Sequence, residues 1–169
     1  MKSPRKAIIK GFYNALSNIT YAGQTVPVYS ASPLKAPNNP YIQIGSVTTV
    51  EEGCKDLFGH ACTIDIQVID SSRDNYATPR AVEEITELVM QTLKPLVLSV
   101  VELSDFYMIN LVLTNTIQDP NIFETAMGYR NIMQWSFDVY ELQGEAIWLL
   151  LDGIWNDSGV WVDSEYWYD

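Results

Sequence analysis

The residues of this sequence best suited to chemistry are Cys54, His60 and Cys62, which form a C-x5-H-x-C pattern. Thiolates and imidazoles are the usual ligands of zinc, but a structural zinc site takes four ligands, commonly in closely spaced pairs. His60 is the only histidine of the chain, so the pattern offers at most three ligands at an unsuitable spacing. We therefore predict no metal site. One cysteine is expected to be a small core residue and the other a loop thiol.

The sequence contains no other pattern typical of catalysis. It has no glycine-rich phosphate loop, no G-x-S-x-G and no H-E-x-x-H. The adjacent carboxylates at residues 51–52 and 83–84 point in different directions on a regular element, which indicates solvated faces and not an acid–base pair. We expect no catalytic residue and no cofactor, and we predict that the chain is not an enzyme.

A second kind of chemistry, the binding of another polypeptide, is indicated by residues 145–169. This segment holds four of the five tryptophans, and six carboxylates but no lysine or arginine. Its large aromatic residues are Trp148, Trp155, Trp161, Tyr166, Trp167 and Tyr168. Aromatic anchors surrounded by polar groups are typical of protein interfaces, so we interpret the segment as a strap that lies on a neighbouring subunit. The alternative is a hairpin that completes the chain's own core.

The opposite charge is found at the other end of the chain. The first ten residues contain Lys2, Arg5, Lys6 and Lys10 but no acid. A basic head and an acidic strap are complementary, and head-to-tail contact between copies would bring them together. We therefore name Lys2, Arg5 and Lys6 as candidate partners of the strap. The alternative is two independent solvated ends, since chain termini commonly carry exposed charge.

The composition of the whole chain limits its class. With 169 residues and 47% hydrophobic content it is long enough for one sizeable core, and we assign residues 1–142 to a single domain and residues 143–169 to an extension. The net charge of −11 argues against a surface that grips nucleic acid, though not against one that nucleic acid slides past. No apolar run is long enough for a membrane span, and no signal peptide is predicted. Two cysteines suggest a reducing compartment.

Two segments have the periodicity of amphipathic helices, and we expect helices near residues 4–18 and 79–94. In the first, Ser3-Pro4 predicts an N-cap followed by proline at the first helical position. Thr78-Pro79 repeats this signal in the second. The apolar stripe of the second helix is predicted to comprise Val82, Ile85, Val89 and Leu93.

Four longer segments are predicted to be strands, at residues 41–50, 60–69, 108–117 and 131–140, with a short strand near 26–30. Loops are expected at residues 32–40, 51–59 and 118–130. The order of elements predicts an α+β fold: a mostly antiparallel sheet of four or more strands with two helices on one face. Trp135 and Phe137 are expected to be buried against the second helix.

Several of these segments resemble the tail-completion or tail-terminator proteins of tailed bacteriophages. The matching features are the first helix with Gly11-Phe12-Tyr13, the segment Pro40-Tyr41-Ile42, the strand Ile64-Asp65-Ile66-Gln67-Val68 and the end Trp135-Ser136-Phe137-Asp138-Val139-Tyr140. The resemblance covers about residues 5–141. The strap that follows is not part of the usual pattern.

The resemblance implies a structural virion protein of the tail or neck, assembled in the host cytoplasm. Such proteins form a ring, here a hexamer or dodecamer, that caps the tail or joins it to the head connector. Expected partners are portal, connector or tail-tube proteins, and DNA passes through the lumen without specific binding. The alternative function is a cellular regulatory module of ferredoxin-like type that binds a small ligand between subunits.

Overall fold

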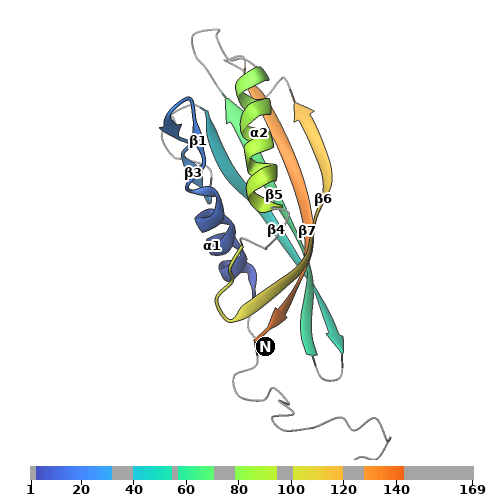
Figure 1. Cartoon of the computed structure of the whole chain (residues 1–169). Helices are drawn as coiled ribbons and strands as arrows, with labels where there is room; N and C mark the ends of the chain where they lie inside the picture. The colour runs from blue at the N-terminus through green and yellow to red at the C-terminus, as the bar shows by residue number, and fades with distance from the viewer. Residues whose placement is uncertain are drawn as a thin grey trace, which may run out of the picture.

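A twisted five-stranded sheet carries both helices on one of its faces (Figure 1). The computed structural model describes residues 3–31, 40–54, 57–70, 79–94, 101–119 and 128–142. The sheet has the order β3-β4-β5-β7-β6, in which only the β3–β4 pair is parallel. Its strands are β3 (Val28–Tyr29), β4 (Tyr41–Cys54), β5 (Leu57–Asp70), β6 (Phe106–Asp119) and β7 (Tyr129–Glu141). This confirms the predicted α+β class.

The two helices form as the apolar spacing predicts. They are α1 (Arg5–Leu16) and α2 (Pro79–Leu93), and α2 buries all four residues of the predicted stripe. The predicted cap of α1 is wrong, because Pro4 and not Ser3 occupies the N-cap position, and it makes no side-chain cap hydrogen bond. The Pro4 carbonyl accepts the first helical hydrogen bond, from the Ile8 amide at 2.9 Å.

The predicted loop at residues 51–59 is also wrong. β4 and β5 remain paired as far as Cys54 and Leu57, so most of that segment is strand. Gly59 lies within β5, and the lack of a side chain at this position has a packing reason. A Cβ atom there would lie 2.8 Å from a ring carbon of Tyr140 on β7. The absent side chain therefore makes room for a tyrosine, and does not break the strand.

Strand pairing likewise shortens the predicted loop at residues 118–130. Asp119 pairs with Arg130 at the end of the β6–β7 ladder, and their side chains form a 2.8 Å ion pair. Residues 120–127 lie outside the described residues, as does nearly all of the predicted proline-rich loop at residues 32–40.

A two-stranded hairpin that the sequence did not suggest follows α1. It consists of β1 (Thr20–Tyr21) and β2 (Gln24–Thr25). Its turn residues Ala22 and Gly23 both have positive φ, of 50° and 80°. This is the backbone pattern of a tight hairpin turn, in which alanine is an unusual first residue.

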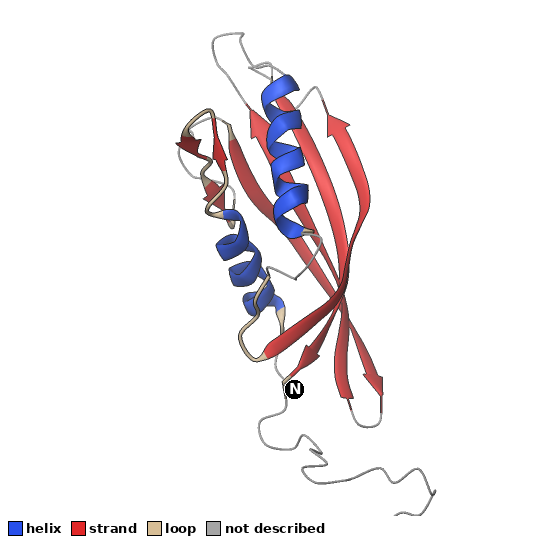
Figure 2. Ribbon diagram, in the orientation of Figure 1, coloured by secondary structure: helices blue, strands red, loops and turns tan. Residues whose placement is uncertain are grey.

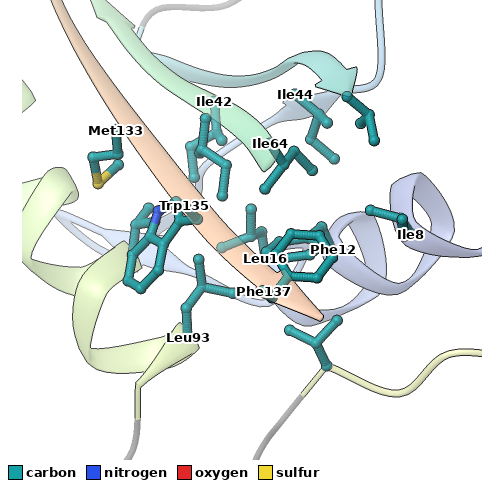
Figure 3. Close-up of a cluster of buried hydrophobic side chains, with 14 of the residues drawn as sticks. Ile8, Phe12, Leu16, Ile42, Ile44, Ile64, Leu93, Met133, Trp135 and Phe137 are labelled. Atoms are coloured by element: carbon teal, nitrogen blue, oxygen red, sulfur yellow. The ribbon is translucent and has the colours of Figure 1, made fainter. Parts of the chain in front are cut away.

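The core lies between the helices and the near face of the sheet. Met133, Trp135, Phe137 and Val139 of β7 are all buried there, together with the apolar stripe of α2, as predicted. Phe137 also contacts α1, where its ring lies 5.5 Å from that of Phe12 (Figure 3). Both helices therefore share one core with β7.

A buried polar contact fixes α2 on this sheet. Thr86 donates a hydrogen bond to the Val82 carbonyl at 2.6 Å, and Asn131 of β7 donates one to the Thr86 hydroxyl at 3.1 Å. Buried polar groups of this kind are costly when unpaired, so the contact favours one placement of the helix.

Candidate interface: the helix-free face of the sheet and its β6 edge

Both helices lie on one face of the sheet (Figure 2). The opposite face carries small polar side chains in register across three strands. Thr48, Thr63 and Ser136 form one cross-strand row, and the two threonine hydroxyls hydrogen-bond to each other. Asp65 and Gln134 form the next row, with the Gln134 amide donating to Asp65 Oδ1 at 3.3 Å. No helix packs on this face within the described part of the chain.

Three bulges bend the sheet along this face, one in β4 and two in β6, the last of them between Leu113 and Asn115. The first lies between Ile44 and Val47, where the Ser46 hydroxyl donates to Asp65 Oδ2 at 2.6 Å. The second lies between Ile109 and Val112. Bulges increase local twist and redirect side chains, and they are common at sheet edges and near functional sites.

Exposed apolar side chains concentrate on the β6 side of the same face. Ile109, Val112 and Ile117 are 40–50% exposed. Their cross-strand partners on β7 are Asp138, Ser136 and Ile132, all on the helix-free side. β6 is also an edge strand, with no partner strand beyond it among the described residues. A long edge that exposes apolar side chains is a template for pairing with another chain.

The described cations lie mainly in the helical layer, where α2 also carries the carboxylates Glu83, Glu84 and Glu87. Arg5, Lys6 and Lys10 lie on α1, and Arg80 and Lys94 lie on or directly after α2. The helix-free face instead presents Asp65 and Asp138, and its one described cation, Arg130, is paired with Asp119. This face is consequently neutral to acidic, and it lacks the clustered cations that bind phosphate.

Of the C-x5-H-x-C residues, the structure describes the side chains of His60 and Cys62. Cys62 is a buried core residue, as one alternative predicted, and its pair partner on β4 is Thr49. Cys54 lies at the end of β4 opposite Leu57, so it is a strand residue and not the loop thiol expected. Within the described residues, no three groups of the types that bind metals lie together.

Burial also suppresses the chemistry of the Cys62 thiol. Desolvation, with a smaller contribution from Asp138, raises the pKa of Cys62 to about 11. The thiol donates a 3.5 Å hydrogen bond to the His60 carbonyl. His60 is itself buried, and its Nε2 atom has no partner in the described structure. A protonated, buried thiol is a poor nucleophile and a poor ligand, because both roles require the thiolate.

The structure places only two of the proposed interface residues. Arg5 and Lys6 are exposed on the first turns of α1. Lys2 lies outside the described residues, as do the strap residues Trp148, Trp155, Trp161, Tyr166, Trp167 and Tyr168. The strap and the basic head therefore remain a prediction. The sequence did not indicate the apolar β6 edge, because the two register shifts in that strand break its alternation of apolar and polar residues.

None of the described helices has both the length and the apolarity required to cross a membrane. No protein-family model matches the sequence, and no curated protein matches it. Among solved structures, the fold is similar to that of a chain in the virion of a native gene transfer agent particle. The TM-score is 0.66 at 17% sequence identity, over 83% of this chain and 99% of that one. At this identity the likeness shows a shared fold, and about a sixth of the present chain has no counterpart.

Proposed function

We propose that this chain is a structural protein of a phage-like virion, and that it forms a ring at the head–tail junction. The observation that carries the proposal is the fold, which nearly the whole of a virion chain shares. It agrees with the independent resemblance of residues 5–141 to tail-terminator proteins. The ring, its position and its DNA channel go beyond the shared fold and belong to the proposal.

The β6 edge supplies the contact that a ring requires. A ring closes through a heterologous interface, in which two different surfaces of one protomer meet on neighbouring copies. In the proposed ring, the edge and the exposed side chains of Ile109 and Val112 lie against the next subunit. Burial there removes apolar area from water and covers unpaired backbone groups.

The helix-free face lines the lumen in the proposed ring. Its described charges are carboxylates, apart from the paired Arg130, so phosphates moving past it find no unpaired cation. A basic lumen would release counterions from DNA and hold it, whereas an acidic one lets it slide. The helices, including α1 with Arg5, Lys6 and Lys10, then face outward.

The second candidate function has less support. A ferredoxin-like module has the element order β-α-β-β-α-β. Here α1 precedes every strand, and the two longer strand pairs, β4–β5 and β6–β7, each follow a helix. No catalytic role is proposed, because the described residues bring no nucleophile together with a base.

The test is the mass in solution of a Val112→Lys variant. A lysine on an exposed edge opposes strand pairing, so the variant is expected to be a folded monomer where the unchanged protein is a ring. Gln91→Lys, an exposed position on α2, is the matched control and should leave the ring intact. A Val112→Lys protein that still forms the full ring would exclude β6 as the interface.

A further inference from the structure

The solvent side of α1 contains a shallow groove of about 610 Å³. Ile9 and Tyr13 contribute its apolar surface, and Ser30, just after β3, closes one side. Tyr13 is 41% exposed, so its ring is accessible to another molecule. The volume lies within the range of about 300–1,000 Å³ of pockets that enclose small ligands, so one or two large side chains fit.

The rim of the groove is basic. It is formed by Arg5, Lys6 and Lys10, which are all exposed. Throughout the described residues, none of the three forms an ion pair, whereas Arg80 and Arg130 each pair with a carboxylate. Three unpaired cations around an apolar floor are complementary to a segment that combines aromatic rings with carboxylates.

We propose that this groove is the docking site for residues 145–169 of a neighbouring copy. The segment carries four tryptophans and six carboxylates, with no cation to compete for them. In the proposed complex a tryptophan lies against Ile9 and Tyr13, and carboxylates on either side pair with the rim. The C-terminal segment therefore supplies the carboxylates and aromatic rings that complement the cations and apolar floor of the groove.

The choice of a neighbour's segment over the chain's own follows from the proposed ring, in which two different surfaces of one protomer meet on neighbouring copies. The groove opens on the solvent side of α1, whereas Phe137 of β7 packs against Phe12 on the core side of that helix. Residues 143–169 span at most roughly 90 Å when fully extended, which is ample to reach an adjacent subunit.

This inference rests on the proposed ring, and tryptophan fluorescence of the full chain tests the two separately. Trp135 is buried in the core, so acrylamide quenching of the other four tryptophans reports on the strap. Lys6→Glu/Lys10→Glu should increase quenching several-fold. Lys94→Glu, at an exposed lysine after α2, is the control for the change in charge and should leave quenching unchanged. Tyr13→Ser tests the apolar contact and should increase quenching without a change in charge.

A charge-swap variant gives the sharpest outcome. Adding Asp157→Lys and Asp163→Lys to Lys6→Glu/Lys10→Glu should restore protection, because the pairs re-form with reversed sign. Quenching that is equal in the groove variant and in the unchanged ring would overturn the inference and leave the ring proposal standing. Protection that persists in dilute monomers would assign the groove to the chain's own segment, which also overturns it. A protein that is monomeric at every concentration would instead contradict the proposed function.

Discussion

Asn110 donates a 2.9 Å hydrogen bond to Asp138 across the β6–β7 pair, from a backbone conformation with a φ of 56°. Asn110 sits inside the first β6 bulge, as Ser46 sits inside the β4 bulge with its own hydrogen bond to Asp65. Each of these two bulges is therefore held by a side-chain bond to an aspartate of the neighbouring inner strand. The two aspartates thus have a structural role on the face that we propose lines the lumen.

The left-handed backbone at Asn110 predicts that two substitutions differ in their effect on stability. Asn110→Gly should be nearly neutral, because glycine adopts this conformation freely and the lost hydrogen bond is exposed. Asn110→Val should be less stable than Asn110→Gly by about 1–2 kcal/mol, because a β-branched residue is strained there. Urea unfolding of both variants measures the difference. Equal stabilities would show that the bulge relaxes at no cost.

The core between α2 and the sheet predicts that Ile85→Asp fails to fold. Ile85 is fully buried, and an unpaired carboxylate at that position costs several kcal/mol. Gln91→Asp places the same carboxylate on the exposed side of the same helix and should melt like the unchanged protein. A cooperative thermal transition in the Ile85→Asp variant would mean that the core is assigned to the wrong residues.

Burial of Cys62 predicts a loss of stability in alkaline solution. The unfolded thiol ionises near its ordinary pKa of 9.0, whereas the folded one remains neutral until about 11. The unfolded chain therefore releases its proton first, and the free energy of unfolding should fall as pH rises through this window. Tyr21 and Tyr41 also have raised pKa values, caused mainly by burial, and add to the fall. Chemical unfolding from pH 8 to 11 should therefore show a shallower decline for Cys62→Ala.

We predict that removal of the strap prevents assembly but leaves the chain folded. The described core is closed by residues up to Leu142, whose amide bonds to the Asp105 carbonyl at 2.8 Å. A chain ending at Leu142 should keep its circular dichroism spectrum and its melting transition but fail to join the mature assembly. If that chain is unfolded, the strap completes the protein's own core, and the hairpin alternative is correct.

The helices and the inner strands were predictable because their apolar residues recur at regular spacing. α2 and β7 show this best, since each has one largely apolar buried face and one more polar face. The predictions failed where local residue type and tertiary contact disagree. Gly59 suggests a turn in isolation, yet it is a strand residue because Tyr140 fills the space above it. Ala22 adopts a positive φ, a conformation that alanine rarely takes, so its residue type does not indicate the turn.

The candidate interface was harder to predict than the core. Two bulges shift the register of β6, so Ile109, Val112 and Ile117 share a face without sharing a period of two in the sequence. That arrangement depends on pairing with β7, which only the folded sheet specifies. The basic head, in contrast, was evident from sequence, since α1 exposes Arg5 and Lys6 as its apolar spacing requires.

The central claim is that copies of this chain close into a ring with a channel for DNA. The most direct measurement is the mass of the purified full-length protein, combined with electron microscopy of the same sample. The claim predicts one species of six or twelve times the 19.1 kDa chain mass, imaged as a closed ring with an open centre wide enough for duplex DNA. A monomer or an isologous dimer at all concentrations, or a closed particle without a channel, would contradict it.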